Sequence, residues 1–510
     1  MLKRLIPLLV LSVAVCHAQD VPANTPTEIS SALTKMDSYV HSIMAKTKVP
    51  GVAVAVVYQD KVIFLKGYGV RKVGEAATVD PDTVFELASL SKPVASTVMA
   101  SLVGAGKIGW DDRIAELDPG FALSNAAVTK QVTIRDMFSH RSGLATSSGD
   151  ILEDLGYSRP EILWRLRYLP LQGEFRKVYN YSNFGLTEGA IAASKKVGES
   201  WEKISRERLY SRLGMNSTSS RYSDYENSPN KAALHVFEHG EPVNRFVRDA
   251  DAESPAGGVS SSVRDLAQWM RLQLNDGKWN GQQIVGATAL AETHKPQMCN
   301  AHPGKVIGPT CDANKYYGLG WNAGNIEGKP MWNHSGAFLL GAATTVYLLP
   351  GEKLGIVVLT NAQPVGAPEA IALSFLDYVH YGKEKMDYLA VLAKVFQQMT
   401  DESTAGDYSA KTPPEPAAPA KPLSAYAGRY SNAFYGDLDI EVERGQLVLR
   451  LPPRGAYYEL THWDGDTFTY HLKTENSGSR QGLKFTDRNH VLVENLAVID
   501  SGVFTRVANQ

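Results

Sequence analysis

The chain has 510 residues, of which 44% are apolar and 21% charged, a composition typical of a globular protein with material for roughly two to four domains. Lysine and arginine number 52 against 54 acidic residues, so the formal net charge is −2 and no basic excess favours a nucleic-acid partner. No acidic run indicates a solvated tail.

The first 18 residues have the pattern of an export signal. A basic start is followed by an apolar run from Leu5 to Val15, which is too short to span a bilayer. Small residues precede a cleavage point after Ala18, so residues 1–18 are predicted to be a signal peptide and the mature protein to be periplasmic or secreted. A lipoprotein cut before Cys16 is the alternative. No later segment has the length and apolarity of a transmembrane helix.

Residues 27–46 carry apolar side chains at spacings of three and four, which predicts an amphipathic helix. Two apolar runs, 51–58 and 62–65, follow on either side of a short turn and predict a β-hairpin. A long middle region then contains helix-like pieces and many loops. Its clearest helix is 262–276, where Ser262 and Asp265 have the spacing of a capping box.

Two cysteines remain after the predicted signal, Cys299 and Cys311. An exported protein meets an oxidising environment, so a disulfide between them is predicted, and its short loop would contribute about 2–3 kcal/mol. Two unpaired thiols are the alternative. No histidine or second cysteine pair stands at zinc spacing, so no metal site is predicted.

Strands return near residue 342. The runs 342–349 and 354–360 flank a Pro-Gly turn and predict a second hairpin, and Pro368 opens another helix. Because the two hairpins can share one sheet, the predicted fold class over residues 25–385 is α/β, an antiparallel sheet flanked by helices plus a helical lobe. A cleft between the two parts would hold a site.

Five prolines with interspersed alanine make 401–422 a predicted stiff, extended linker. Beyond it, apolar residues alternate in 438–442 and 447–451, across a turn at Arg444-Gly445. Residues 423–510 are therefore predicted to form a separate small antiparallel β-barrel-like domain.

A serine and a lysine three residues apart, Ser89 and Lys92, form the first motif that carries chemistry. Side chains at this spacing share a helix face, and a serine hydroxyl becomes a good nucleophile only when an adjacent base takes its proton. A lysine serves as that base when burial lowers its pKa. Pro93 is tolerated near a helix start, which places Ser89 at the N-terminus of an apolar helix. The alternative is that Ser89 only caps this helix.

The same spacing occurs twice more, at Ser200/Lys203 and Ser228/Lys231. Both pairs stand among charged or turn-forming residues. We therefore expect them at the surface.

Tyr181-Ser182-Asn183 is the second motif. A phenol can relay protons, and an amide can hold the lysine and position a substrate carbonyl. Similar pairs occur at Tyr225/Asn227 and Tyr430/Asn432. Tyr430 is expected to pack the C-terminal domain instead.

His334-Ser335-Gly336 is the third motif, shortly before the second predicted hairpin. Gly336 would let a ligand approach the backbone of an edge strand closely. By itself the triplet is more typical of a turn, so it gains weight only from the other two motifs.

Taken together in this order, the three motifs resemble the serine β-lactamase and penicillin-binding-protein superfamily, on the side of class C β-lactamases and D-alanyl-D-alanine carboxypeptidases. The resemblance covers about residues 25–385. The C-terminal domain resembles small β-barrel-like domains appended to some D-amino-acid peptidases of the superfamily. Four further pieces are similar to the family: Thr133-Ile134-Arg135, His140-Arg141-Ser142-Gly143-Leu144, Gly257-Gly258-Val259 and Tyr317-Gly318-Leu319-Gly320-Trp321.

The resemblance implies a catalytic role for three side chains. Ser89 would attack a carbonyl and form an acyl-enzyme, and Lys92 and Tyr181 would share the work of the base. The oxyanion hole would consist of the backbone N–H groups of Ser89 and Ala337. No cofactor or metal is implied.

The resemblance also implies a substrate-binding edge. Asn183 would position the substrate, and His334, Ser335 and Gly336 would line the edge. Many β-lactamases have a lysine where His334 stands, whereas histidine is more usual in the peptidases of the superfamily. Histidine is largely uncharged near neutrality, although it can still donate a hydrogen bond.

The predicted function is therefore a serine hydrolase that cleaves amide or ester bonds, with peptides bearing D-residues or related small acyl compounds as substrates. A β-lactamase or a small-ester esterase is the alternative, and a penicillin-binding sensor with little turnover is the second. An α/β-hydrolase and a zinc hydrolase are disfavoured because the chain contains neither Gly-x-Ser-x-Gly nor His-Glu-x-x-His. The oligomeric state stays open.

Overall fold

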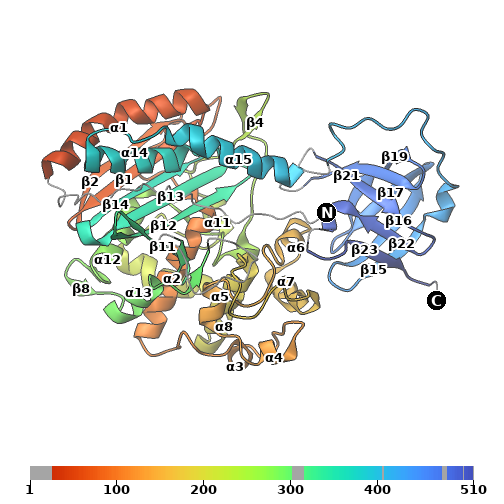
Figure 1. The fold of residues 1–510 in the computed structure, drawn as a ribbon, viewed down its shortest axis with the longest axis horizontal. Helices are drawn as coiled ribbons and strands as arrows, with labels where there is room; N and C mark the ends of the chain where they lie inside the picture. The colour runs from red at the N-terminus through yellow and green to blue at the C-terminus, as the bar shows by residue number, and fades with distance from the viewer. Residues whose placement is uncertain (1–25, 301–314, 405–406, 474–478, 498, 509–510) are drawn as a thin grey trace.

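An eight-stranded sheet forms the centre of the larger domain (Figure 1). The computed structural model describes residues 26–300, 315–404, 407–473, 479–497 and 499–508. The strand order is β2-β1-β14-β13-β12-β11-β10-β9, and every neighbouring pair is antiparallel. The strands are β1 (Gly51–Tyr58), β2 (Lys61–Gly69), β9 (Met298–Cys299), β10 (Tyr316–Tyr317), β11 (Asn322–Ile326), β12 (Lys329–Phe338), β13 (Ala342–Leu349) and β14 (Leu354–Thr360).

Both predicted hairpins are present, as β1/β2 and β13/β14. Strand β1 pairs with β14 in a register that sets Val52 opposite Thr360, so the two ends of the domain share one sheet as predicted. The α/β fold class with an antiparallel sheet is confirmed.

Helices cover both faces of this sheet. Val52, Val54 and Val56 of β1 pack in the cluster that contains α1 (Pro26–Thr47) and α14 (Ala367–Tyr381). The alternate residues of β1 face the other way, towards α2 (Ser91–Gly104) and α12 (Val263–Leu274). Side chains of a strand alternate between faces, so a strand buried on both faces is apolar throughout, which explains the valine-rich run of β1.

The predicted helical lobe lies beyond α2 (Figure 1). Its helices are α3 (Ile114–Leu117), α4 (Ala126–Thr129), α5 (Ile134–Phe138), α6 (Asp150–Asp154), α7 (Arg159–Arg165), α8 (Asn183–Val197), α9 (Trp201–Ser205), α10 (Ser211–Leu213) and α11 (Tyr222–Glu226), with α13 (Ala287–Thr293) nearer the sheet. Two-stranded pairs join β3 (Phe85–Glu86) to β6 (Ser260–Ser261), β4 (Val236–Glu238) to β5 (Glu241–Val243), and β7 (Lys278–Trp279) to β8 (Gln282–Gln283).

The start of helix α12 differs from the capping box predicted for Ser262 and Asp265. Ser262 caps it by accepting the N–H of Asp265, as expected. The Asp265 carboxylate does not complete a capping box, because it accepts the N–H of Ser217 and the hydroxyl of Thr218 instead. The carboxylate thus ties the helix start to a neighbouring loop.

The C-terminal domain is a nine-stranded antiparallel sheet, as predicted, in the order β18-β17-β16-β15-β23-β22-β21-β20-β19. The sheet is nearly closed and barrel-like, with Tyr430 fully buried inside. Its strands are β15 (Gly428–Asn432), β16 (Gly436–Glu443), β17 (Gln446–Leu451), β18 (Ala456–Glu459), β19 (Thr461–Asp464), β20 (Thr467–His471), β21 (Arg480–Phe485), β22 (His490–Val493) and β23 (Val503–Arg506).

The segment predicted as a linker differs from the expectation. Helix α15 (Tyr388–Thr404) extends into its first residues. Later residues lie against the β-domain: Ala418 N–H donates to Asp464, and Lys421 forms an ion pair with Asp466. Proline excludes a helix here but leaves backbone groups free to bond a neighbouring surface.

The β-domain contacts the helical lobe directly. The hydroxyl of Tyr157, between α6 and α7, donates to the backbone oxygen of Tyr435, and Arg165 donates to that of Phe434 at 2.9 Å. One continuous cluster of buried apolar side chains includes residues of both domains.

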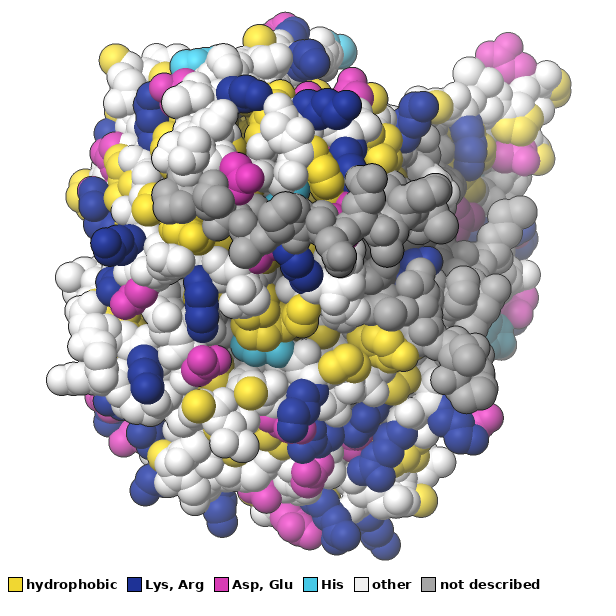
Figure 2. Space-filling model, turned by 60° about the vertical axis from the view of Figure 1, so that its left-hand side comes forward, with side chains coloured by type: hydrophobic (Ala, Val, Ile, Leu, Met, Phe, Trp, Pro, Cys, Tyr) yellow, Lys and Arg dark blue, Asp and Glu magenta, His cyan; other side chains and the backbone are white. Residues whose placement is uncertain are grey.

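On the face drawn in Figure 2, basic and acidic side chains are interspersed rather than separated into patches. Within the described part of the chain, no helix is both long enough and apolar enough to cross a bilayer.

Candidate active site

Ser89 lies in a single 3₁₀ turn, Ala88–Leu90, that leads directly into α2. It is the one half-buried residue in a run of buried residues from 83 to 102. Ala88 before it has φ +48°, a strained value for a residue with a Cβ. Pro93 is the third residue of α2, within the turn whose N–H groups have no helical partner. The serine therefore lies half-buried at a helix start, and its place at the N-terminus of the helix is as predicted.

Lys92 is fully buried, and its Nζ contacts three oxygen atoms. The distances are 3.0 Å to Ser89 Oγ, 2.6 Å to Asn183 Oδ1 and 3.1 Å to the backbone oxygen of Ala256. An amide oxygen and a backbone oxygen only accept hydrogen bonds. Of the three partners, Ser89 is the one that can give a proton to Lys92.

Burial lowers the pKa of Lys92 from its ordinary 10.5 to about 8, while the charges of Glu253 and Asp150 act in the opposite direction. Burial also disfavours the charged form of these two carboxyl groups. It raises the pKa of Asp150 to about 7 and that of Glu253 well above its ordinary value. A much larger fraction of Lys92 is therefore neutral near physiological pH than of an ordinary lysine, and the neutral form is the one that a base requires.

Asn183 is the first residue of α8, and its amide is fixed by two contacts. Its Oδ1 accepts from Lys92, and its Nδ2 donates to Asp150 Oδ2 at 3.3 Å. The amide oxygen therefore faces the lysine, and the carboxylate on α6 holds it in that orientation.

Tyr181 precedes α8, and its ring centroid lies 4.5 Å from Lys92 Nζ. Burial raises the pKa of its phenol above the ordinary value, opposed by a hydrogen bond with Ser89. The phenol therefore keeps its proton at neutral pH. The structure brings Ser89, Lys92, Tyr181 and Asn183 together from two segments of the chain, 89–92 and 181–183.

The other Ser–Lys pairs lie at the surface, as expected. Ser200 caps α9 by accepting the N–H of Lys203, and the ammonium of Lys203 pairs with Glu199. Lys231 donates instead to the backbone of Glu226.

The similar Tyr–Asn pairs do not approach Ser89 either. Tyr225 bonds the backbone of Ala232, and Tyr430 bonds that of Tyr426 within the β-domain.

His334 is 3% exposed, and both of its ring nitrogens are used inside the protein. Nδ1 lies 2.7 Å from the backbone oxygen of Ser335, so Nδ1 carries the proton, and Nε2 accepts from the hydroxyl of Tyr317 at 3.1 Å. Burial lowers the pKa of His334 to about 3, so the ring is neutral. The histidine positions Tyr317, and neither nitrogen is left to donate to a substrate.

The hydroxyl of Ser335 points away from the binding edge that the sequence predicted it to line. Its hydroxyl bonds Thr345 on β13 at 2.9 Å and also Glu369 of α14. Because neighbouring residues of a strand face opposite ways, His334 faces the Ser89 side of the sheet and Ser335 faces α14.

Gly336 permits a close approach of the protein's own backbone, whereas the sequence predicted the close approach of a ligand. A Cβ there would lie 2.2 Å from the backbone oxygen of Leu87, so glycine lets the turn that carries Ser89 pack directly on β12. Pairing of β12 with β11 ends at Asn333, which leaves the following residues, including Ala337, beyond that pairing and beside the turn. The oxyanion role of Ala337 stays a prediction.

The backbone oxygen of Ala256 is a contact that the motifs did not identify. It is brought to Lys92 by the β3–β6 pairing and by the bond from Leu87 N–H to Val259 O. Gly258, two residues further on, has no room for a Cβ, which would lie 2.7 Å from the backbone oxygen of Ala250. A backbone acceptor leaves no side-chain signal, but the neighbouring Gly257-Gly258 pair was available as one.

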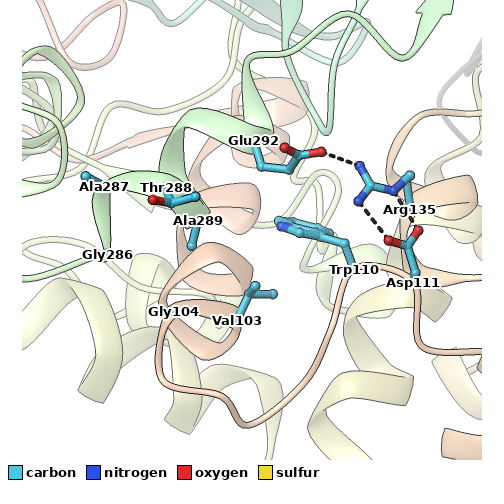
Figure 3. Close-up of a pocket in the computed structure, with 10 residues that line it drawn as sticks. All are labelled: Val103, Gly104, Trp110, Asp111, Arg135, Gly286, Ala287, Thr288, Ala289 and Glu292. Atoms are coloured by element: carbon cyan, nitrogen blue, oxygen red, sulfur yellow. Dashed lines mark hydrogen bonds and ion pairs between the residues drawn. The ribbon is translucent and has the colours of Figure 1, made fainter.

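A separate pocket of about 580 Å³ lies at the other end of α2 (Figure 3). Trp110 points into it, and Arg135 is held on one side by Asp111 and on the other by Glu292, at 2.7 and 2.6 Å. The described residues that line it include none of those predicted for the site.

Cys299 is disulfide-bonded, and its predicted partner Cys311 lies outside the described residues, as do residues 1–18. Across the described ranges, no three histidine, cysteine or acidic side chains are grouped so that they could hold a metal ion.

Comparison with known proteins gives two family matches. The model described as Beta-lactamase matches residues 36–377, and one described as a domain of unknown function (DUF3471) matches residues 412–495. The chain is 24% identical over 463 residues to an unguisins hydrolase of Aspergillus violaceofuscus, covering 84% of this chain and 81% of that protein. It is 27% identical over 326 residues to penicillin-binding protein 4 of Amycolatopsis lactamdurans, covering 61% and 81%.

Two solved structures share the fold. An octameric penicillin-binding protein homologue from Pyrococcus abyssi superposes with a TM-score of 0.58 at 18% identity, covering 91% of this chain and 98% of that one. A class C β-lactamase from Rhodobacter sphaeroides gives a TM-score of 0.55 at 20% identity, covering 67% and 98%. Since the Beta-lactamase model matches more than half of the chain, the protein belongs to the Beta-lactamase family of serine hydrolases.

Proposed function

We propose that this protein is an exported serine hydrolase that cleaves amide or ester bonds through an acyl-enzyme on Ser89. The observation that carries the proposal is the hydrogen-bonding geometry of Lys92. A neutral amine has two N–H groups and one lone pair. Asn183 Oδ1 and Ala256 O can only accept, so they take the two N–H groups. The lone pair then faces Ser89 Oγ and receives its proton during attack.

The proton transfers balance over one acylation. Ser89 Oγ bonds to the carbonyl carbon as its proton passes to Lys92. Tyr181 gives its phenol proton to the leaving amine or alkoxide, the C–N or C–O bond breaks, and Lys92 returns a proton to Tyr181. Water then releases the acyl group by the reverse transfers. The raised pKa of Tyr181 suits this role because the phenol starts protonated.

We propose short peptides or amides bearing D-residues as the preferred substrates. A lysine at position 334 would face an anionic β-lactam with a fixed charge, whereas the buried, neutral His334 offers none. The relatives named unguisins hydrolase and penicillin-binding protein 4 support acyl chemistry of this kind. A small-ester esterase would use the same groups, because an ester needs less protonation of its leaving group.

The test compares kcat/KM for a D-alanyl anilide, a short-chain nitrophenyl ester and a chromogenic cephalosporin, with Ser89→Ala as the blank. We expect the anilide or the ester to be preferred. A wide preference for the cephalosporin would identify a β-lactamase. Labelling by fluorescent penicillin without turnover of any of the three would identify a sensor.

His334→Lys tests the charge argument. We expect it to improve kcat/KM for the cephalosporin selectively and so to narrow the gap between substrates. His334→Gln, which adds no charge, is the control. Equal changes for charged and uncharged substrates in His334→Lys would contradict the argument.

Export is proposed from residues 1–18. Expression of the whole chain, followed by intact-mass analysis of the product, should give a mature protein that begins after Ala18, in the periplasm or the medium. A lipid-modified product beginning at Cys16 would favour the lipoprotein alternative, and an uncleaved chain would contradict export by this signal.

A further inference from the structure

We propose that His140 is the residue that positions Tyr181 for proton transfer. The inference rests on the proposed role of Tyr181 and assigns a function to the one histidine of the His140–Leu144 motif. His140 is 1% exposed and lies after α5, far from Tyr181 in sequence.

Three contacts join His140 to the segment that carries Tyr181. The backbone oxygen of His140 accepts the N–H of Asn180 at 2.9 Å, and its ring Nδ1 accepts the N–H of Ser182 at 3.2 Å. These two bonds lie on either side of Tyr181. The ring of His140 packs on the ring of Tyr181, with centroids 4.5 Å apart. One residue therefore fixes both the backbone and the ring plane of the phenol.

The backbone conformation of His140 indicates that a histidine is present at this position for a functional reason. Its φ is +57°, in the left-handed region, which is strained for a residue with a Cβ. Glycine would relieve that strain but would lose the Nδ1 acceptor and the ring. Strain retained beside a reacting group is typical of a functional site.

The protonation state of the ring fits this role. An acceptor at Nδ1 requires that this nitrogen carry no proton. Burial, with the nearby charge of Lys92, lowers the pKa of His140 well below its ordinary value. A neutral ring is therefore maintained, and it accepts from Ser182 without placing a second cation beside Lys92.

Two substitutions separate the hydrogen bond from the ring. In His140→Asn, Oδ1 occupies the position of Nδ1 relative to Cβ, and asparagine tolerates a positive φ. In His140→Phe, the ring stays and the acceptor is lost. Since a displacement of about 1 Å can cost on the order of 100-fold in rate, we expect His140→Phe to lower kcat by about 30- to 100-fold with KM nearly unchanged. His140→Asn should stay within about fivefold of the native rate.

The matched control is His294→Phe. His294 is also buried, but it stacks on Trp332 with centroids 3.5 Å apart, and it contacts none of the described residues assigned to proton transfer. This substitution should leave kcat unchanged. Thermal unfolding of all three variants shows whether His140→Phe loses rate beyond what its stability explains.

A double substitution tests whether His140 acts through Tyr181. If it does, His140→Phe should change kcat by less than about threefold in a Tyr181→Phe background, because the group it positions is already absent. An equal loss in both backgrounds would overturn the proposal, as would an unimpaired His140→Phe enzyme.

Crystal structures of His140→Phe and His140→Asn give a readout that does not depend on activity. We expect Tyr181 to be displaced from Ser89 in the first and to stay in place in the second. An undisplaced Tyr181 in His140→Phe overturns the positioning role. If Tyr181→Phe alone leaves kcat unchanged while His140→Phe still displaces the phenol, the proposed function of Tyr181 fails and the positioning contact stands.

Discussion

The two ends of α2 hold two cations in opposite ways. At the N-terminal end, the three oxygens that contact Lys92 belong to neutral groups. At the other end, where Gly104 lines the pocket in Figure 3, Arg135 pairs with two carboxylates. The pKa of Lys92 falls because of burial, and that of Arg135 rises because of its hydrogen bond with Asp111.

The difference separates a reactive cation from a structural one. Neutral partners compensate poorly for the lost hydration of an ammonium, so Lys92 gives up a proton readily. Two carboxylates stabilise a guanidinium that already has no accessible neutral form. A cluster of charged side chains beside a pocket is thus a weaker indicator of chemistry than a buried lysine with neutral partners.

The largest expected effect is that of Ser89→Ala. Loss of the nucleophile should lower kcat by on the order of 10⁴-fold or more and abolish covalent labelling by a fluorophosphonate or a fluorescent penicillin. Ser200→Ala and Ser228→Ala are the controls and should keep both. Intact-protein mass spectrometry that finds the adduct on another serine would refute the assignment.

Replacing the lysine at position 92 by arginine and the arginine at position 135 by lysine tests the comparison directly. Lys92→Arg keeps the charge but removes the ability to accept a proton, so kcat should fall by roughly 10²–10⁴-fold. The reciprocal change, Arg135→Lys, should leave kcat within about twofold. Similar losses in both variants would show that the partners of the two cations do not distinguish their roles.

The pH dependence should follow Lys92. Its pKa is lowered to about 8, so below that pH the amine is increasingly protonated and cannot take the proton of Ser89. We expect kcat/KM on an uncharged ester to rise about tenfold per pH unit and to level off above pH 8. Arg135→Lys should give the same profile. A profile that is flat from pH 6 to 9 would contradict the role of Lys92 as base.

The smallest expected effect is on stability. Arg135→Lys replaces a planar, two-sided donor with a single ammonium, and Asp111 is 73% exposed while Glu292 is 22% exposed. We expect a loss of about 1 kcal/mol in the free energy of unfolding, measured by urea denaturation, with labelling of Ser89 unchanged. A large loss of labelling would mean that the pocket and the site are coupled through α2.

Local patterns predicted much of the fold. The valine-rich run of β1 and the Pro-Gly turn between β13 and β14 gave hairpins at the expected places, because alternation and turn chemistry act over few residues. Strands β9 and β10 were not predicted, since two-residue strands have no periodicity to detect, and β11 was not predicted because its apolar residues do not alternate. The predicted linker begins within α15, which ends at Thr404, although Gly406 shortly after that end is a helix-stop signal in the sequence.

The site was predicted in part for the same reason. Ser89 and Lys92 are one helical turn apart, and Asn183 is two residues from Tyr181, so each pair has a local signature. Ser335 was assigned to the binding edge although the strand alternation turns its hydroxyl towards α14. Which of two neighbouring residues faces a site is decided by the packing of the sheet.

The sequence by itself determined three features: a serine and a lysine one turn apart at the start of an apolar helix, the two hairpins of the main sheet, and the β-domain. These features depend on short-range periodicity and turn residues. Only the tertiary structure decided that Lys92 meets the backbone oxygen of Ala256, that Asp150 orients Asn183, and that His140 holds the segment of Tyr181. These contacts join segments up to 164 residues apart through backbone atoms and burial. Neither a backbone acceptor nor the desolvation of a lysine can be inferred from residue spacing. Both depend on how the chain packs, so only the tertiary structure decided the chemistry of the site.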